Sequence, residues 1–250
     1  MWEVVNQTPF AADRGWTRDR DGMEVWLVAV KATFDIRPDG STEVCREQPP
    51  VLEAPEYHGE PGKSSIKYEA DLVPTKKTTD IIVVGHAQAP GARPVAELDV
   101  GFRLGPVQKM VKVFGDRSWG VLGPTSPMPF ARMPLVYERA FGGVDPQSAA
   151  PERDWDWRNP VGCGFAAQAS NRAGAGLPNL ELPNLLIRSP GDRPAPAGLG
   201  AIACHWKPRV DFGGTYDERW MKTRQPLLPE DFDDRFYQCA PADQQPPQFL

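Results

Sequence analysis

The sequence predicts an all-β fold, mainly an antiparallel meander that closes as a sandwich or an open barrel, with long Gly/Pro-rich loops and a few short helices. Two observations carry this prediction. The first half of the chain alternates apolar and polar residues with the period of two that is typical of a half-buried strand. In addition, the 250 residues include 23 Gly and 28 Pro, residues that break helices and mark turns.

The first clear strand follows a turn at Asp21-Gly22, a pair that suits the positive φ angles of a tight hairpin. Residues 24–36 then alternate in polarity along a single predicted strand. The apolar set of this alternation is predicted to lie on one buried face and consists of Val28, Val30, Ala32, Phe34 and Ile36. A second turn is expected at Asp39-Gly40.

Further strands are expected at residues 66–73, 80–89, 96–104 and 107–114, where apolar and β-branched side chains are frequent. A Gly-Pro pair at residues 105–106 joins the last two strands as a turn. No helical pattern of a dozen residues interrupts this series. Consecutive strands are therefore predicted to pair as antiparallel neighbours.

From residue 115 onward the pattern changes to short apolar pieces between Pro and Gly residues. We expect these loops to be packed by their own side chains, because tryptophans are frequent there and disordered segments are poor in aromatic residues. Asp217–Arg224 is expected to form a short helix. The prediction is one β-rich domain over residues 1–250, strand-rich in 1–114 and loop-rich in 115–250.

The composition excludes several classes of ligand. The net charge is −5, and the 28 basic and 33 acidic residues are spread evenly, so we expect no direct contact with nucleic acid. The longest apolar run, residues 25–30, is far shorter than the about 20 residues that span a bilayer. The N-terminus lacks the basic and apolar regions of a secretory signal. We therefore expect a cytoplasmic protein without membrane contact, whose 4 cysteines are reduced.

No catalytic residue, cofactor or metal is expected. Cys204-His205 lacks a second close pair of zinc ligands. Residues 62–64 (Gly-Lys-Ser) match the end of a phosphate-binding loop, but neither the preceding strand nor the following helix is predicted. One enzymatic alternative stays open, a carbohydrate-active hydrolase with tryptophans as sugar platforms and two catalytic carboxylates near Asp231, drawn from Glu230, Asp231, Asp233 and Asp234.

Several short segments, in a fixed order over nearly the whole chain, are shared with a known family. The most specific is Met133-Pro134-Leu135, followed at residues 137–143 by Tyr-Glu-Arg-Ala-Phe-Gly-Gly. The others include Lys31-Ala32-Thr33-Phe34, Val113-Phe114-Gly115-Asp116-Arg117, Asn159-Pro160-Val161-Gly162, Leu177-Pro178-Asn179-Leu180-Glu181 and Gly214-Thr215-Tyr216-Asp217 with Trp220. In these segments the chain resembles family 2169 of the domains of unknown function.

This resemblance implies an adaptor or chaperone of a bacterial type VI secretion system rather than an enzyme. Members of the family are encoded beside VgrG, PAAR and toxin genes. The resemblance implies that the protein binds a toxin effector and helps to load it onto the VgrG/PAAR spike without travelling with it. It also implies a longer parent protein, because family members continue beyond the position of Leu250. A structural or effector module of the spike is a second alternative.

An adaptor of this kind needs a broad contact surface with aromatic and arginine side chains as anchors. The candidates for partner binding are Arg117, Trp119, Tyr137, Glu138, Arg139, Phe141, Trp155, Trp157, Asp217 and Trp220. A structural role is the alternative for the same residues. In that case Glu138 and Arg139 pair internally, and residues 141–143 pack a loop onto the sheet.

Overall fold

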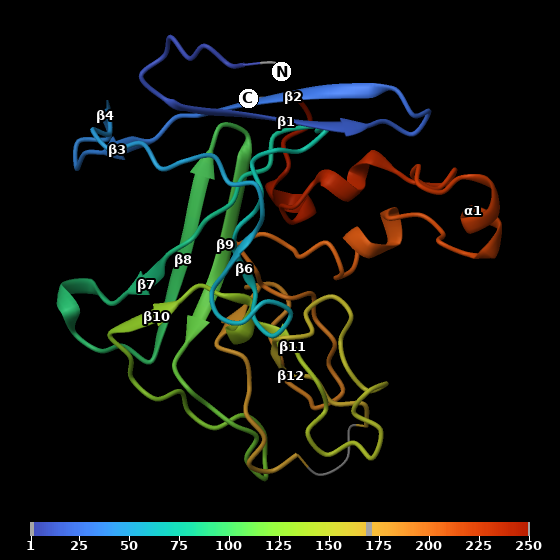
Figure 1. Cartoon of the computed structure of the whole chain (residues 1–250). Helices are drawn as coiled ribbons and strands as arrows, with labels where there is room; N and C mark the ends of the chain where they lie inside the picture. The colour runs from blue at the N-terminus through green and yellow to red at the C-terminus, as the bar shows by residue number, and fades with distance from the viewer. Residues whose placement is uncertain (1–2, 169–171, 250) are drawn as a thin grey trace.

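The computed structural model describes residues 3–168 and 172–249, and it confirms the all-β class (Figure 1). Its strands form small sheets, which are antiparallel except for one pair of two-residue strands. Within these residues the single α-helix is α1 (Glu218–Thr223), at the place expected for a short helix. No helix of the described chain is long and apolar enough to cross a membrane.

The strands and the short 3₁₀ helices follow one another along the chain without a long regular element. The strands are β1 (Ala11–Arg18), β2 (Glu24–Lys31), β3 (Phe34–Ile36), β4 (Thr42–Val44), β5 (Glu56–Tyr57), β6 (Ile66–Tyr68), β7 (His86–Gln88), β8 (Glu97–Leu104), β9 (Val107–Phe114), β10 (Arg132–Pro134), β11 (Phe141–Gly142), β12 (Cys163–Gly164) and β13 (Leu180–Glu181). The 3₁₀ helices are η1 (Pro90–Ala92), η2 (Tyr137–Arg139), η3 (Arg209–Phe212), η4 (Asp234–Tyr237) and η5 (Ala242–Gln244).

The expected meander is present as antiparallel hairpins that belong to separate sheets. Consecutive strands pair as β1–β2, β3–β4, β5–β6 and β8–β9, and the described strands do not join into one continuous sheet. The connections between hairpins are long, and some make side-chain hydrogen bonds of their own, as described below for Gln48.

The hairpin β8–β9 lies at the centre of the body, as its alternation and its Gly-Pro turn predict (Figure 1). The two strands pair over their full length, and Gly105 takes the positive φ of 55° in the turn. β13 pairs with the other edge of β9. Val111, Val113 and Leu180 are completely buried in the main hydrophobic core. The predicted apolar side chains of β8 pack against this core from Leu98, Val100 and Phe102.

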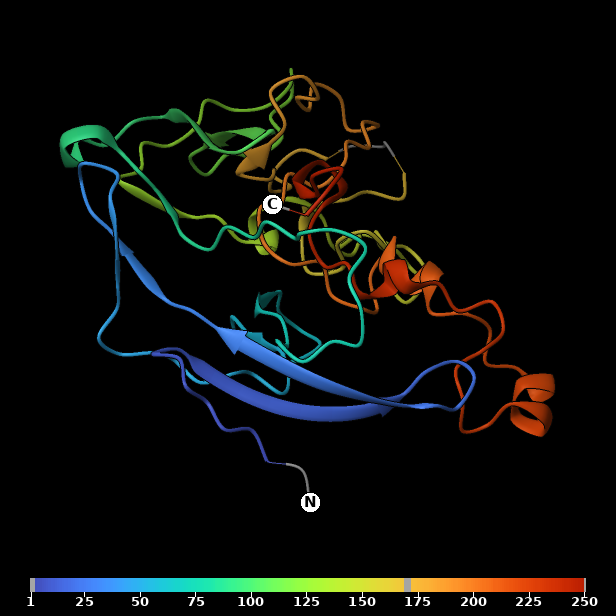
Figure 2. The ribbon, with the colours of Figure 1, turned by 90° about the horizontal axis from the view of Figure 1, so that it is seen from above.

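β1 and β2 form a separate two-stranded ribbon along one side of the molecule, hereafter the ribbon (Figure 2). The predicted turn joins them, with Gly22 at a φ of 86°. One face of the ribbon meets the body. On this face Gly15 lies against Leu72, and Lys31 forms an ion pair with Asp71 at 2.8 Å. The ribbon is therefore attached through its inner face and leaves its outer face toward solvent.

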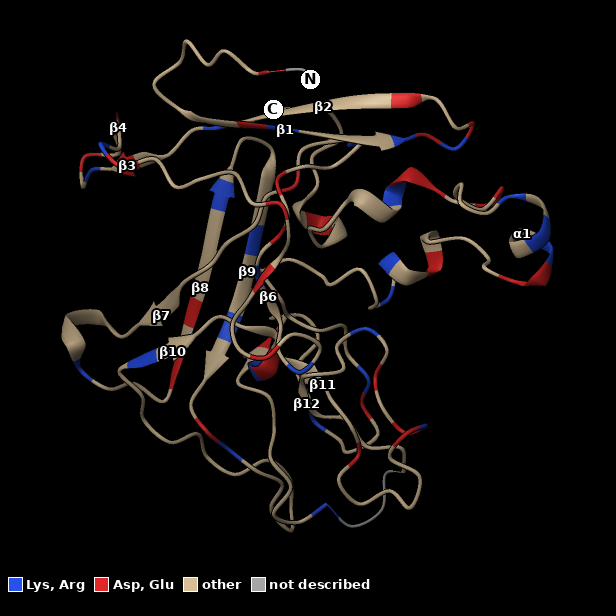
Figure 3. Cartoon of the chain, in the orientation of Figure 1, with Lys and Arg blue, Asp and Glu red and all other residues tan. Residues whose placement is uncertain are grey.

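The buried face predicted for residues 24–36 is wrong, because this apolar set lies on the outer side. Every member of the set is exposed, with Val28 at 64 % and Val30 at 57 %. Figure 3 shows accordingly that most of the outward-lying β2 carries no charge. A period of two defines two faces of a strand, but it does not say which of them meets the body. Here the inward contacts just described turn the opposite face toward the core.

The single strand predicted over residues 24–36 is also interrupted at Thr33. The amide of Thr33 donates to Gln48 Oε1 at 2.8 Å, and Gln48 Nε2 donates to the carbonyl of Thr33 at 3.0 Å. The side-chain amide thus takes the amide of Thr33 and shares its carbonyl with the amide of Cys45, and the strand restarts as β3. The turn expected at Asp39-Gly40 is present between β3 and β4, with Gly40 at a φ of 84°.

Two other predicted strands are shorter than expected. The strand at residues 66–73 reduces to β6, and the one at residues 80–89 reduces to β7. In the latter segment the amide of Ile81 donates to the carbonyl of Gln244, whereas the amide of Val83 donates to a different loop. The apolar run therefore lies between loops without one continuous strand partner, and it is buried at Ile81 but exposed at Val84.

The segments around β11 and β12 cross at very short backbone distances. Gly143 has a φ of 84°, and a Cβ atom on it would lie 2.1 Å from the carbonyl oxygen of Gly162. Asn159 is completely buried, and its Nδ2 donates to the carbonyls of Tyr137 at 2.8 Å and Phe141 at 3.0 Å. The most specific segment of the family resemblance thus meets a second one, residues 159–162, at this crossing.

We expect Gly143→Ala to lower the free energy of unfolding by about 3 kcal/mol or more, because a side chain meets both an unfavourable φ and a backbone clash. Urea denaturation measures the change. Gly85→Ala is the matched control, because Gly85 has no atom near its would-be Cβ and no positive φ. Equal stability of the two variants would contradict the close crossing.

Candidate functional site

Some of the residues predicted to bind a partner have largely or fully buried side chains, namely Arg117, Trp119, Tyr137 and Phe141. Arg117 forms an ion pair with the buried Glu181. Trp119 and Phe141 belong to one core cluster. The ring of Tyr137 packs edge-on against Trp206, with ring centroids 5.4 Å apart. These side chains hold loops onto the sheets, which is the structural role considered for them.

Glu138 and Arg139 also make internal contacts, although not with each other. Glu138 accepts hydrogen bonds from the amide and the hydroxyl of Ser65, both at 2.7 Å. Arg139 Nη1 contacts Asp116 Oδ1 at 3.1 Å and Asn179 Oδ1 at 3.0 Å. Arg139 keeps a partly exposed side chain. A role of Arg139 in partner binding stays a prediction, and the same holds for the other candidates with accessible side chains.

Trp155 and Trp157 lie together on one loop, and Trp157 is accessible. Their ring centroids are 4.0 Å apart with an interplanar angle of 31°, and Trp157 is 48 % exposed. The amide of Lys207 donates to the carbonyl of Trp157 at 2.9 Å, which ties this loop to the segment before η3. Trp157 is therefore the predicted candidate that best fits an aromatic surface anchor.

Asp217 and Trp220 lie at the N-terminal end of α1. This helix projects from the side of the body (Figure 1). The carboxylate of Asp217 accepts from the amide of Trp220 at 2.8 Å, as an N-cap does. The indole of Trp220 donates to the carbonyl of Leu227 at 2.8 Å. Asp217 and Trp220 line a hollow that shares no lining residue with the cleft at Tyr137, so the ten candidates do not line one common site.

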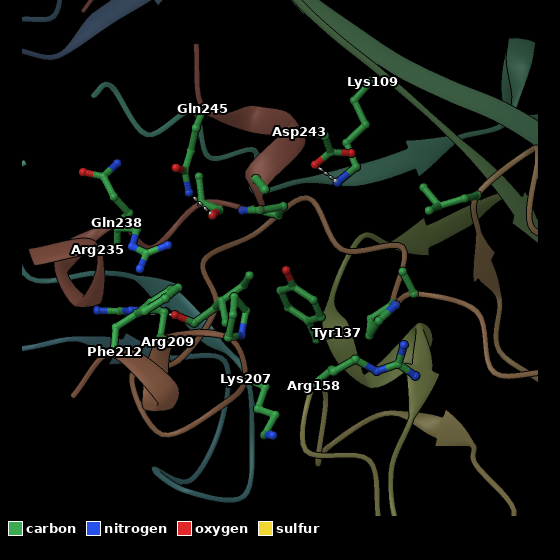
Figure 4. A pocket seen from close by; sticks show the side chains of 18 residues that line it. Lys109, Tyr137, Arg158, Lys207, Arg209, Phe212, Arg235, Gln238, Asp243 and Gln245 are labelled. Atoms are coloured by element: carbon green, nitrogen blue, oxygen red, sulfur yellow. Dashed lines mark hydrogen bonds and ion pairs between the residues drawn. The ribbon is translucent and has the colours of Figure 1, made fainter. Parts of the chain in front are cut away.

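A cleft of about 530 Å³ lies between β9, η2, η3 and the segment before and within η5, hereafter the cleft (Figure 4). Much of its lining is apolar and comes from Tyr137, Leu182, Ala195, Pro196, Ile202, Pro208, Phe212, Ala240, Pro241 and Ala242. These residues are far apart in the sequence. The cleft has the volume and apolar lining of a typical ligand site.

Two basic residues that line the cleft are buried and have structural partners. Lys109 Nζ donates to the carbonyl of Gly198 at 2.7 Å and pairs with Asp243 at 2.9 Å, and burial lowers the pKa of Lys109. Arg209 pairs with Glu69 at 2.6 Å. These contacts fasten η3 and η5 to the body, and they leave the charges at the inner end of the cleft compensated.

Three further basic residues lie at the cleft with accessible side chains and are called the rim cations: Arg158, Lys207 and Arg235. Figure 4 shows Arg235 on the other side of the lining from Arg158, with Lys207 near Arg158 and Tyr137. Sequence reasoning missed these residues, because isolated basic residues at such separations resemble any solvated surface. Only the long-range folding of the loops brings them together.

The carboxylates near Asp231 are all engaged in the described structure. Asp231 accepts from the hydroxyl of Thr215 at 2.7 Å and from its amide at 2.9 Å, and these bonds lower the pKa of Asp231. The hydrogen bond from Arg235 lowers the pKa of Asp233 in the same way. A general acid in glycoside hydrolysis needs a raised pKa. The remaining carboxylates pair with cations as Glu230–Arg219 and Asp234–Lys77.

The potential metal ligands and the cysteines of the described residues do not gather into a metal site. Across residues 3–168 and 172–249, no three His, Cys, Asp or Glu side chains are placed to hold a metal ion. Cys204 is exposed and Cys239 is buried. Burial raises the pKa of the Cys239 thiol to about 12, which keeps this thiol protonated.

We expect Tyr137→Ala to lower the free energy of unfolding by about 3–5 kcal/mol, because a completely buried aromatic ring between the cleft and Trp206 is lost. Tyr137→Phe should cost less than about 1 kcal/mol, since the hydroxyl is 3.4 Å from the carbonyl of Gly200 and bonds weakly. Chemical denaturation of both variants measures the difference. A large loss in the Phe variant would show that the hydroxyl, and not the ring, matters.

Comparison with known proteins places this β-rich chain with its apolar cleft in a bacterial family. A family model described as an uncharacterized protein conserved in bacteria (DUF2169) matches residues 21–250. The chain belongs to the DUF2169 family. No curated protein and no solved structure matches the chain.

Proposed function

We propose that the protein is an adaptor or chaperone of a bacterial type VI secretion system. In this role it binds a toxin effector in the cytoplasm and helps to load it onto the VgrG/PAAR spike. Two lines support the proposal. The family resemblance seen in the sequence implies this class of protein, and the outer face of the ribbon offers a surface suited to a protein partner.

The outer face of the ribbon is the observation that carries the proposal. Trp16 is 59 % exposed and pairs across the ribbon with Trp26, which is 49 % exposed, and the exposed Val28 and Val30 follow on the same face of β2. An aromatic side chain can bury about 150–250 Å², so the two tryptophans each present on the order of 100 Å². With the aliphatic side chains the surface reaches the size of the largest apolar patches on monomers, about 300–600 Å². Patches of this size commonly mark protein interfaces.

The backbone of the ribbon favours an extended segment as the occupant. Within the described chain, β1 and β2 pair only with each other, so each strand has an outer edge without a neighbouring strand. A segment of the toxin that adds to such an edge gains main-chain hydrogen bonds, and its alternate side chains reach the apolar outer face. An aggregation-prone segment of the toxin would be kept soluble in this way before it is loaded.

Co-expression with the neighbouring toxin and spike genes tests the proposal. The tagged protein should copurify the toxin, and the toxin should be soluble only when the protein is present. If the protein instead leaves the cell with the spike, secreted-fraction analysis will detect it there, and the structural-module alternative will hold. Absence of both toxin binding and toxin solubilisation would overturn the adaptor proposal.

A further inference from the structure

The cleft is distinct from the ribbon, and its chemistry points to a different part of a partner. We propose that the cleft binds a peptide segment in which an apolar side chain is flanked by carboxylates. This inference deepens the proposed function, and it rests on that function only in assigning the segment to the toxin or the spike. The binding chemistry itself follows from the lining of the cleft.

The inner part of the cleft selects an apolar group. Its volume of about 530 Å³ accommodates one or two large side chains, and Tyr137, Ile202 and Phe212 line it. The two lining residues with buried charge, Lys109 and Arg209, are already paired and offer little to a polar ligand. A phenylalanine or leucine side chain therefore fits this part better than a charged one.

The rim selects negative charge. Among the described residues that line the cleft, Asp243 is the acidic one, and it is engaged by Lys109. The carboxylates that pair with the rim cations lie outside the lining, in the pairs Arg158–Asp156, Arg235–Asp233 and Lys207–Asp211. The lining itself thus offers three accessible cationic side chains, and their exposed ion pairs are each worth little. An acidic ligand can share these cations, whereas a basic ligand finds no free carboxylate in the described lining.

The rim cations have donors to spare for this ligand. Arg158 uses Nε and Nη2 for Asp156, and Arg235 uses the same two nitrogens for Asp233. In both residues Nη1 has no hydrogen-bond partner within the described structure. Lys207 Nζ lies 3.6 Å from its carboxylate, too far for a hydrogen bond. Each rim cation can therefore donate to a ligand carboxylate without breaking its existing contact.

Trp157 does not itself line the cleft, but it precedes the rim cation Arg158 in the chain. It is half exposed, stacks on Trp155 and is joined to Lys207 through the backbone hydrogen bond described above. A rigid tryptophan beside arginine and lysine is the composition that dominates the energetics of protein interfaces. We therefore assign Trp157 as the aromatic contact for the residues that flank the apolar anchor.

Isothermal titration calorimetry with synthetic peptides tests this proposal directly. The probe is acetyl-Glu-Glu-Phe-Glu-Glu-amide. Two comparison peptides replace the glutamates by lysines or the phenylalanine by alanine. We expect saturable binding of the probe and at least about tenfold weaker binding of either comparison peptide, since each lacks one of the two complementary features. Binding of the probe should also weaken at high salt.

Charge reversal at the rim provides the second arm. Lys207→Glu combined with Arg235→Glu should weaken binding of the probe at least tenfold and improve binding of the lysine peptide. Lys222→Glu is the matched control, because Lys222 also forms an exposed pair four residues away, with Glu218, but does not line the cleft. Circular dichroism and the Tm establish that each variant is folded.

The outcomes separate this proposal from the proposed function. No saturable binding of the probe, or equal binding to the rim variant and the wild type, overturns the cleft assignment. If the toxin still copurifies in that case, the adaptor proposal stands without the cleft. If the peptide binds as expected but no toxin copurifies, the cleft assignment stands and the adaptor proposal fails.

Discussion

Asp145→Ala is expected to lower the free energy of unfolding by about 3–5 kcal/mol, because it leaves the charge of Arg172 buried without its partner. Both guanidinium nitrogens Nη1 and Nη2 of Arg172 donate to this carboxylate at 2.7 Å. The amides of Gln147 and Ala167 donate to it as well, both at 2.9 Å. The two charged side chains are only 4 % and 3 % exposed. Urea denaturation at neutral pH measures the loss.

Glu60→Ala is the control for this variant, because the pair of Glu60 with Lys63 is highly exposed. Exposed pairs contribute about 0–1 kcal/mol, so the control should remain close to the wild type. A loss below about 1 kcal/mol in Asp145→Ala would contradict the importance of the buried pair.

The lowered pKa of Asp145 makes the stability of the folded protein depend on pH in the acid range. The hydrogen bonds from Arg172 hold the pKa of Asp145 well below its usual range. Its contribution is therefore fully present above the ordinary Asp pKa of about 4, and it is lost as the pH falls below that value toward the folded-state pKa. Between about pH 4 and pH 2 the wild type should lose Tm more steeply than Asp145→Ala. Parallel pH profiles of the two proteins would contradict this assignment.

Removal of the apolar outer face of the ribbon is the second change with a large expected effect. We expect Trp16→Ser, Val28→Thr and Val30→Thr together to reduce toxin copurification more than tenfold, because these exposed side chains are the proposed contact. Stability should change little, since the side chains point away from the body. Quantitative pull-down from equal amounts of folded protein measures the effect.

Val121→Thr with Leu122→Ser is the matched control for the ribbon variant. These two side chains are almost fully exposed in a loop that belongs neither to the ribbon nor to the cleft. If the control variant loses the toxin as strongly as the ribbon variant, the loss comes from making any exposed surface more polar and not from the outer face of the ribbon. If the ribbon variant retains the toxin like the wild type, the outer face is not the contact.

Local signals in the sequence predicted the fold where a few neighbouring residues decide the structure. The turns at Gly22, Gly40 and Gly105 are present because each needs a positive φ that glycine adopts readily. The helix α1 starts where Asp217 caps it. These features depend on contacts within a handful of positions, and single-sequence patterns contain that information.

Long-range contacts decide the parts that were not predicted. The inward face of the ribbon depends on Leu72 and Asp71, and the interruption at Thr33 depends on the side chain of Gln48. No local pattern around residues 24–36 predicts the contacts with these distant residues. Alternation alone therefore predicted the strand and assigned the wrong face to the core.

The candidate site divides in the same way. The family segments drew attention to Tyr137 and Phe141, and the structure shows that both rings are buried and pack the loop crossings. The rim cations lie outside those segments and meet only after folding. The proposed rim contacts and the residues that pack the loop crossings therefore come from different parts of the sequence.

Toxin delivery by a strain that lacks this gene is the most direct test of the adaptor proposal. The neighbouring toxin and spike genes stay intact, and delivery is measured as killing of a toxin-sensitive competitor. We predict that deletion abolishes killing, that the wild-type gene restores it, and that the ribbon variant does not. Unchanged killing by the deletion strain would contradict the proposed function outright.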